Sequence, residues 1–399
     1  LKAKDWYHRG ISGNYQAPLR TRIHVKVPGE QLQDREYMKQ ALALAEKGHG
    51  WVNPNPMVGA VLVKDGRIIG EGYHTRYGQL HAEREAFKNA AERGEETAGA
   101  DLYVTLEPCC HTGKQPPCTE AVLASGVKRV IVGCTDPNPV VAGRGIRLLR
   151  EKGLEVVAGV LRGECERQNE VFFHFMRTKL PFTVLKYAMT LDGKTATVLG
   201  KSQWITGEAA RKRVHEDRGR YMAILTGVST VLADNPQLTC RIPGGKNPIR
   251  VIADTKLRTP LSSTVVQTAR ETPTWIVTAV SDTGRKKAYE DAGCRVLSVP
   301  AKEGELDLQA MMQLLGEEKV DSVMVESGGT LAWSFLKAGL VNRVQAYIAP
   351  KIFGGAGAPT PVRGTGVDAP PEAFLLKKPE AVWLGEDLLL EYEVSGQDA

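Results

Sequence analysis

The chain contains 399 residues, of which 42% are hydrophobic and 25% are charged, which is typical of a packed globular protein of two domains and excludes a disordered or collagenous chain. The net charge is +6, but six basic and two acidic residues lie within residues 1–30, so the rest carries only +2 and nucleic acid is not an expected partner. No stretch approaches 18 uninterrupted apolar residues and no apolar run follows the basic N-terminus, so we expect no membrane span, no secretory signal and a cytoplasmic location.

The first part of the chain alternates helices and strands. Residues 1–31 lack a clear periodicity, and we treat them as an N-terminal extension. Apolar residues from Tyr37 to Ala45 recur at helical spacing and end at Gly48, and Asp65-Gly66 is a hairpin signal. In chain order we predict a helix from residue 35 to 48, strands at 57–63 and 67–71, a helix at 81–93, a strand at 102–106, a helix at 118–124, a strand at 127–133, a helix at 145–152, a strand at 154–160 and a helix at 164–176. This alternation predicts a three-layer α/β/α domain over residues 32–177.

A second α/β domain, residues 178–399, begins at a short polar hinge. The expected elements are strands at 182–188, 221–226, 249–253, 274–279 and 295–299, a helix at 307–317, a strand at 320–325, a helix at 330–339, a strand at 343–350 and strands near 382–394. The last of these strands are expected to be antiparallel.

Three segments of the first domain carry possible metal ligands. His81, Cys109 and Cys118 supply one imidazole and two thiolates, the set that suits Zn²⁺ when its fourth position is left to water. Cys110 is an alternative to Cys109, but the position directly after Pro108 fits the pattern better. Seven cysteines, two of them adjacent, do not suggest a disulfide framework, and we interpret the other four as structural: Cys134, Cys165, Cys240 and Cys294.

Glu83 lies two residues after His81, at the start of a predicted helix. Water on Zn²⁺ has a pKa near about 7, and a carboxylate at this position would carry its proton to a leaving amine. The alternative is that the tripeptide arose by chance and that each cysteine is an apolar filler. A glutamate beside a His/Cys/Cys metal site is, however, the arrangement of the zinc deaminases.

Four motifs in this half resemble the bifunctional deaminase–reductase of riboflavin biosynthesis: NPNPMVG (53–59), HAE (81–83), TLEPCCHTGKQPPC (105–118) and DPNPVVAGRG (136–145). Eight residues separate the two cysteines, where nucleoside and tRNA deaminases have two. The resemblance implies a cytidine-deaminase-like fold, zinc ligands at His81, Cys109 and Cys118, and a proton shuttle at Glu83. It places contacts to a pyrimidine and its ribose phosphate at Asn55, His74, His111, Lys114, Asp136 and Asn138. For Asp136 and Asn138, turn formation is the alternative.

In the second half, no G-x-G-x-x-G follows a predicted strand, so the usual dinucleotide-binding fingerprint is absent. A turn with two glycines is instead the candidate phosphate-binding site. Glu326 and Ser327 follow a predicted strand, and Gly328 and Gly329 precede a predicted helix. Glycines let backbone N–H groups approach a phosphate, and a helix N-terminus favours the anion. Taken alone, the pattern is equally that of an ordinary turn.

Three motifs of this half resemble the reductase of the same family: SQWITG (202–207), GVSTVLADNPQLTCR (227–241) and ESGGT (326–330). The resemblance implies a dihydrofolate-reductase-like fold that uses NADPH. It places cofactor contacts at Ala188, Trp204, Thr230, Asp234, Thr255, Gly328, Gly329, Thr330, Leu331, Ala332, Trp333 and Ser334. Substrate contacts fall at Lys186, Ser202, Arg218, Leu238, Arg241 and Glu326. Arg218 and Arg241 suit a phosphate monoester, since guanidinium groups pair with it bidentately.

Together these patterns predict an enzyme that deaminates a phosphoribosylated diaminopyrimidinone and then reduces its ribosyl group to ribityl with NADPH. We expect a small-molecule substrate, a homo-oligomer, and no nucleic-acid or membrane partner. Two alternatives are a nucleic-acid or nucleoside base deaminase with an accessory domain, and a zinc-stabilised binding module without catalysis. The first would need a basic, aromatic groove, and the second would normally hold zinc with four protein ligands.

Overall fold

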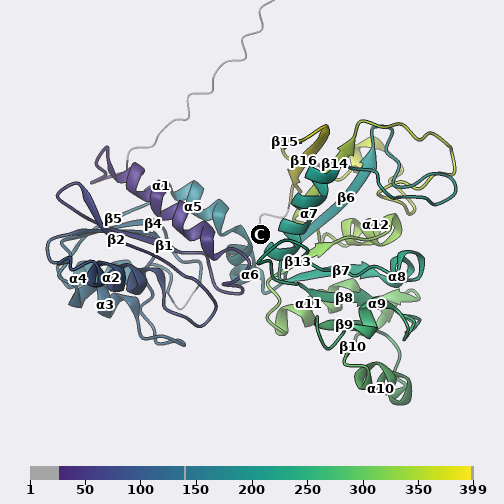
Figure 1. Cartoon of the computed structure of the whole chain (residues 1–399), viewed down its shortest axis with the longest axis horizontal. Helices are drawn as coiled ribbons and strands as arrows, with labels where there is room; N and C mark the ends of the chain where they lie inside the picture. Colours follow the sequence, from purple (N-terminus) through teal and green to yellow (C-terminus); the bar gives the residue numbers. More distant parts are fainter. Residues whose placement is uncertain (1–26, 139–140, 397–399) are drawn as a thin grey trace, which may run out of the picture.

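The computed structural model describes residues 27–138 and 141–396, which build two large open β-sheets, each with helices on its faces, and one small two-stranded sheet (Figure 1). The predicted N-terminal extension lies outside the described residues up to residue 26. Within the described ranges, every helix is too short or too polar to cross a bilayer.

The first sheet is built from residues 59–158. Its region contains α1 (Asp34–Ala45), η1 (Glu46–Gly48), β1 (Gly59–Lys64), β2 (Arg67–Tyr73), α2 (Ala82–Glu92), β3 (Asp101–Leu106), α3 (Cys118–Ala124), β4 (Arg129–Cys134), α4 (Arg144–Glu151), β5 (Glu155–Ala158), α5 (Arg162–Gln168) and α6 (Glu170–Thr178). The strand order is β2-β1-β3-β4-β5, with β1 antiparallel to β2 and β3, and with β3, β4 and β5 parallel.

Alternate side chains of the strands face two separate helical layers. Val61 and Val63 of β1 pack in one cluster with residues of α1, α5 and α6, whereas Ala60 and Leu62 pack in another with residues of α2, α3 and α4. This alternation follows from the two-residue period of a strand. The predicted three-layer α/β/α arrangement is confirmed (Figure 1).

The predicted helix at 164–176 is wrong in one respect, because the chain forms two helices that meet at Asn169. Asn169 is buried, and its side-chain amide accepts from the N–H of Met57 and donates to the carbonyl of Met57. The break gives Asn169 a non-helical backbone (φ −108°, ψ 23°) and ties α5 and α6 to the segment that precedes β1.

The second sheet has nine strands. Its region contains β6 (Phe182–Thr190), α7 (Glu208–Arg220), β7 (Ala223–Gly227), α8 (Val228–Asp234), β8 (Ile249–Ala253), α9 (Thr264–Gln267), β9 (Thr274–Thr278), α10 (Thr283–Asp291), β10 (Arg295–Ser298), β11 (Ala301–Lys302), β12 (Glu305–Leu306), α11 (Leu308–Glu317), β13 (Ser322–Val325), α12 (Gly329–Lys337), β14 (Arg343–Ala349), η2 (Pro370–Glu372), β15 (Glu380–Leu384) and β16 (Asp387–Glu393). The order is β10-β9-β8-β7-β13-β6-β14-β16-β15, parallel as far as β14 and antiparallel beyond it, while β11 and β12 form a separate pair.

Helices cover both faces of this sheet. Residues of α11 and α12 pack in one core cluster, while residues of α8, α9 and α10 pack on the other face and those of α7 pack near β6 and β14. The helices α7 to α10 have no counterpart among the predicted elements. In α7 only Ala210, Val214 and Asp217 are buried within a strongly charged segment, so its apolar stripe is too thin to reveal a helix.

Candidate active sites

The three predicted zinc ligands meet at the carboxyl end of β3. His81 is the N-cap residue of α2, Cys118 is the first residue of α3, and Cys109 lies in the loop after β3. The Nδ1 atom of His81 lies 3.6 Å from Sγ of Cys109 and 3.3 Å from Sγ of Cys118. All three donor atoms lie within 4.8 Å of one another. The loop and two helix starts thus bring together residues that are 37 positions apart.

The chemistry of this cluster fits Zn²⁺ in a catalytic rather than a structural site, because it offers one nitrogen and two sulfur ligands. The Cys118 thiol and the His81 ring hydrogen-bond to Cys109 and lower the pKa of the Cys109 thiol, which favours the thiolate that binds metal. Cys110 lies outside the cluster, and burial raises the pKa of its thiol. The four cysteines interpreted as structural are all buried and unpaired: Cys134, Cys165, Cys240 and Cys294.

Glu83 lies in the first turn of α2, beside the cluster but not within it. Its side chain is buried, and burial together with the nearby Cys109 raises the pKa of the carboxyl group. Glu83, His81 and Cys109 line one cavity of about 230 Å³. A carboxyl group with a raised pKa in such a cavity is suited to exchanging a proton.

All six residues that the resemblance assigns to the pyrimidine substrate line this same cavity: Asn55, His74, His111, Lys114, Asp136 and Asn138. The ring of His74 bridges Leu80 and Asn55, with Nδ1 2.9 Å from the Leu80 carbonyl and Nε2 3.2 Å from the amide nitrogen of Asn55. Nδ1 therefore donates and Nε2 accepts, and burial lowers the pKa of His74. This neutral ring orients Asn55 and is not a cation for a phosphate.

Asp136 serves both interpretations of its motif. It lines the cavity, and its Oδ1 also accepts from the N–H of Asn138 at 2.8 Å, which is the expected turn. Burial raises the pKa of Asp136 to about 6. Lys114 places its ammonium group 4.0 Å from the centre of the Tyr77 ring, which also lines the cavity. Residues 139–140 of this motif lie outside the described residues.

Glu107 is a cavity residue that the sequence analysis did not single out. Its buried carboxylate accepts N–H groups of Asp136 at 3.2 Å, Gly143 at 2.8 Å and Ile146 at 3.1 Å. It therefore holds the loop after β4 against the start of α4. The sequence feature that could have revealed Glu107 is its position directly before Pro108 in the motif at residues 105–118.

A second cavity, of about 490 Å³, lies where β6, β7 and β13 of the large sheet end. Open α/β sheets bind ligands at the carboxyl ends of their strands. Eleven of the residues assigned to this site line it: Lys186, Ala188, Ser202, Trp204, Arg218, Thr230, Asp234, Arg241, Glu326, Gly328 and Gly329.

Glu326 is the electrostatic centre of this cavity. Arg218 donates to both of its carboxylate oxygens, at 2.7 and 3.0 Å, and Nζ of Lys186 lies 3.5 Å away. Burial alone would raise the pKa of Glu326, but the two cations lower it to about 2. The guanidinium fork of Arg218 is therefore occupied by a protein carboxylate, and this finding does not support the phosphate pairing expected of Arg218.

His215 also lines this cavity and was not singled out from the sequence. Its Nδ1 lies 3.2 Å from the Thr239 carbonyl and its Nε2 accepts from Nε of Arg241 at 3.3 Å. Burial and the neighbouring Arg218 and Arg241 lower the pKa of His215. A neutral His215 thus supports Arg241.

The two glycines at the start of α12, the N-cap Gly328 and the first helical residue Gly329, have different surroundings. A Cβ atom on Gly328 would meet no atom within 4 Å, whereas one on Gly329 would lie 2.7 Å from the Thr360 carbonyl and 2.6 Å from Cγ of Arg363. Gly328 is therefore the position open to a ligand. Gly329 is needed for the packing of residues 360–363 on α12.

Several residues of the assigned NADPH set do not line the cavity, because α12 turns them away: Thr330, Leu331, Ala332, Trp333 and Ser334. Ala332 is buried in the core, and the Trp333 ring packs 5.7 Å from that of Phe374. Leu238 is also absent from the lining, since it is buried beneath α8 and α9.

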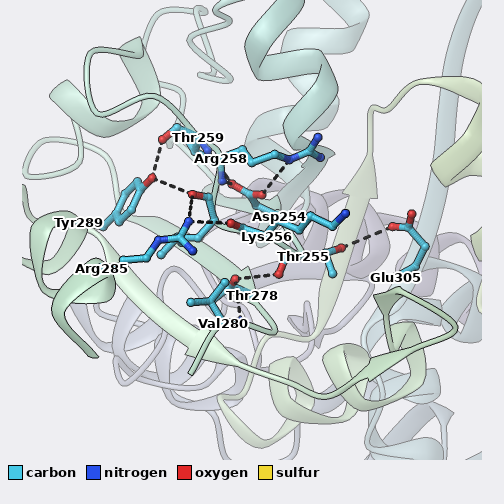
Figure 2. Close-up of polar contacts among 11 residues, drawn as sticks. Asp254, Thr255, Lys256, Arg258, Thr259, Thr278, Val280, Arg285, Tyr289 and Glu305 are labelled. Carbon is cyan, nitrogen blue, oxygen red and sulfur yellow. Dashed lines mark hydrogen bonds and ion pairs between the residues drawn. The ribbon is translucent and has the colours of Figure 1, made fainter. Parts of the chain in front are cut away.

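Thr255 lies apart from the lining, in the turn that follows β8. Figure 2 shows how tightly this turn is held. Oγ1 of Thr255 donates to Glu305 at 3.4 Å, and the Thr255 carbonyl accepts from Oγ1 of Thr278 at 3.2 Å. Oδ2 of Asp254 accepts three hydrogen bonds, from the N–H of Arg258 and from the N–H and hydroxyl of Thr259.

Comparison with known proteins finds a family match for each half of the chain. Residues 31–134 match the cytidine and deoxycytidylate deaminase zinc-binding region, and residues 181–390 match the RibD C-terminal domain. The chain is 49% identical over 361 residues to riboflavin biosynthesis protein RibD of Actinobacillus pleuropneumoniae, covering 90% of this chain and 95% of that protein. The protein of the same name from Bacillus amyloliquefaciens is 45% identical, with 89% and 94% covered.

Two solved structures share the whole fold. The diaminohydroxyphosphoribosylaminopyrimidine deaminase/5-amino-6-(5-phosphoribosylamino)uracil reductase of Thermotoga maritima is 40% identical, with a TM-score of 0.79 over 91% of this chain and 99% of that one. RibD of Acinetobacter baumannii is 35% identical, with a TM-score of 0.81 and the same coverage. The predicted deaminase-like and reductase-like folds are thereby confirmed, as are zinc and NADPH as cofactors. The chain therefore belongs to the RibD family of bifunctional riboflavin biosynthesis enzymes, which join a zinc-dependent deaminase to an NADPH-dependent reductase.

Proposed function

We propose that the first sheet and its helices deaminate a phosphoribosylated diaminopyrimidinone, and that the second sheet and its helices then reduce the ribosyl group of the product to ribityl. The observation that carries the proposal is the meeting of His81, Cys109 and Cys118 in one cluster, beside a cavity that the buried Glu83 lines together with His81 and Cys109. Two family matches, at 31–134 and 181–390, support domains at residues 32–177 and 178–399, preceded by an extension at 1–31.

For the deaminase, we assign His81, Cys109 and Cys118 as the residues that hold zinc. When bound, Zn²⁺ in such a site lowers the pKa of a water molecule so that it can attack at neutral pH. Glu83 moves the proton: its carboxylate Oε takes a proton from the attacking water and returns it to the nitrogen of the departing amine. Glu83 lies in the first turn of α2, and its burial excludes bulk water from the carboxylate.

Polar side chains around Glu83 orient the substrate. Asn55, held by His74, offers an amide to the pyrimidine ring, and Asp136 offers a carboxyl group with a raised pKa. His111 and Lys114 lie along the same cavity, where Lys114 suits the ribose phosphate. Asn138 lines the same cavity, and its N–H donates to Oδ1 of Asp136.

In the reductase, the chain's own residues orient the reactants, and NADPH supplies the hydride. We assign the exposed surface of Gly328 and the start of α12 to a cofactor phosphate. Lys186 beside Glu326 presents a cation to the ribosyl group, with Arg218 fixing the carboxylate. Arg241, supported by His215, is the arginine that we assign to the substrate phosphate.

Two further features belong to this proposal. Its substrate and NADPH are phosphorylated metabolites of the cell interior, which supports a cytoplasmic location. A homo-oligomer is the remaining expectation, and gel filtration with light scattering measures it.

The test uses the purified chain with the phosphoribosyl pyrimidine, with and without NADPH. We expect ammonia release in both reactions and NADPH oxidation only after deamination. Ammonia released from single-stranded RNA but not from the pyrimidine would overturn the proposal, and so would the absence of both activities from zinc-loaded protein.

A further inference from the structure

The segment from Gly50 to Asn55 lies between the two halves of the molecule. On one side it belongs to the deaminase cavity, because Asn55 lines that cavity and Asn55 N–H donates to the Val52 carbonyl at 2.9 Å. The Trp51 carbonyl accepts from the N–H of Tyr77, another lining residue, at 3.1 Å. The position of this segment therefore decides where two walls of the cavity lie.

On its other side the same segment contacts the reductase half. Nδ2 of Asn53 donates to Oδ2 of Asp321 at 2.7 Å, although these residues are 268 positions apart. Nζ of Lys246 lies 3.4 Å from the Gly50 carbonyl. A Cβ atom at Gly50, whose φ is +72°, would collide with the Gly219 carbonyl, so the two backbones touch directly.

Asp321 is a fixed partner for Asn53. It is 1% exposed and directly precedes β13, and its second carboxylate oxygen accepts from the Ser322 hydroxyl at 2.6 Å. That hydroxyl in turn accepts from the N–H of Met222 at 2.9 Å. The carboxylate is thus held by the start of the strand whose other end leads to Glu326, and it cannot follow a displaced Asn53 without breaking these bonds.

We infer that Asp321 of the reductase half is a positioning residue for deamination, which acts through Asn53 to hold Asn55 and the Gly50–Asn55 segment at the pyrimidine. The reductase half thereby holds in place one wall of the deaminase cavity, although every residue that lines this cavity lies between Asn55 and Met176. This inference rests on the proposed role of Asn55 in substrate binding. Asn53 does not line either cavity, so its effect is expected on substrate affinity and not on the chemical steps.

The test replaces Asn53 in the full-length, zinc-loaded enzyme. Losing a hydrogen bond to a charged group changes a binding constant by about tenfold to a hundredfold, and because only part of this loss reaches Asn55 we expect Asn53→Ala to raise the KM for deamination about tenfold. The kcat should stay within about twofold, since an interaction equal in ground and transition states affects only KM. Zinc content and reduction of pre-deaminated substrate should match the parent enzyme.

A reversed pair separates positioning from a general loss of stability. Asn53→Asp alone places two carboxylates together and should raise KM at least as much as Asn53→Ala. Adding Asp321→Asn restores one donor and one acceptor with their roles exchanged, so the double variant should recover most of the parent KM. Asn89→Ala is the matched control, because Asn89 holds the Glu71 N–H at 3.0 Å within the deaminase half alone. Its KM should equal the parent's.

Two results would overturn the inference: an unchanged KM in Asn53→Ala, or a double variant no better than Asn53→Asp. Asn55→Ala distinguishes this failure from failure of the proposed function. If Asn55→Ala raises KM and the Asn53 variants do not, only the positioning role is wrong. If Asn55→Ala leaves KM unchanged, the proposed substrate contact is wrong as well.

Discussion

Replacing Glu83 with glutamine tests proton transfer without altering shape. Glutamine has nearly the same volume as glutamate and keeps a hydrogen-bonding side chain, but its amide neither accepts the proton of the attacking water nor donates one to the leaving amine. Glu83 is only 3% exposed, so bulk water cannot easily reach this position and take over the proton transfer. Because Glu83 lies outside the three-ligand cluster, the variant should retain its zinc.

The expected loss follows from the cost of removing one general acid–base group. Such groups contribute about 10²–10⁴-fold to rate, which corresponds to about 3–5 kcal/mol of transition-state stabilisation. We expect the upper part of this range, since the one carboxylate serves both the attacking water and the departing amine. The loss should fall on kcat, with little change in KM.

The assay measures ammonia release, zinc content and NADPH oxidation on pre-deaminated substrate in the same preparation. Glu85→Gln is the matched control: Glu85 lies in the same first turn of α2 but outside the cavity lining, and its variant should keep all three properties. Deamination by Glu83→Gln within about tenfold of the parent would refute the proton-transfer role. Loss of zinc would instead make Glu83 a ligand.

Three further predictions concern separate features. Cys118→Ser should lower bound zinc and abolish ammonia release while NADPH oxidation on pre-deaminated substrate persists; full zinc occupancy would contradict the ligand assignment. Gly328→Val should raise the KM for NADPH with an unchanged melting temperature, whereas Gly329→Ala should lower the melting temperature, because only Gly329 faces backbone at 2.7 Å. Burial lowers the pKa of His174 from 6.5 to about 4, so between these values the unfolded chain binds a proton that the folded chain does not, and stability falls as the pH drops through this window. Urea titrations at pH 4.5 and 7 give the difference in the free energy of unfolding between the two pH values, and His174→Phe should reduce this difference by up to about 3 kcal/mol. The same difference in the variant and the parent would contradict the assignment to His174.

Local patterns were sufficient to predict most helices and strands. The alternation of Val61 and Val63 with Ala60 and Leu62 places β1 between two layers, and the hairpin signal at 65–66 joins β1 to β2. Helices with a charged surface, such as α7, escaped prediction because few of their residues face the core. The break at Asn169 also escaped it, since its partner Met57 lies 112 residues away.

The chemistry of the deaminase cavity could be predicted from the sequence because its residues lie in short, unusual motifs. Imidazole, thiolate and carboxylate groups are seldom combined for structural reasons, so the order of the motifs, together with their family resemblance, predicted that His81, Glu83, Cys109 and Cys118 belong together. The structure then placed every residue assigned to this cavity around it or in its metal cluster.

The reductase cavity depended more on tertiary structure. Sequence spacing does not reveal that Arg218 is neutralised by Glu326 from 108 positions away, or that α12 turns Ala332 into the core. Gly328 and Gly329 are identical as residues and differ only in what surrounds them.

Sequence by itself thus predicted most of the elements, the two chemistries and a set of metal ligands, because periodicity and short motifs of reactive groups are properties of nearby residues. Only the tertiary structure decided which charges are paired, which glycine is open to a ligand, and that Asp321 meets Asn53 across the two halves. These features arise from contacts between segments that are distant in the chain, and only the folding of each half and the packing of the two halves bring such segments together.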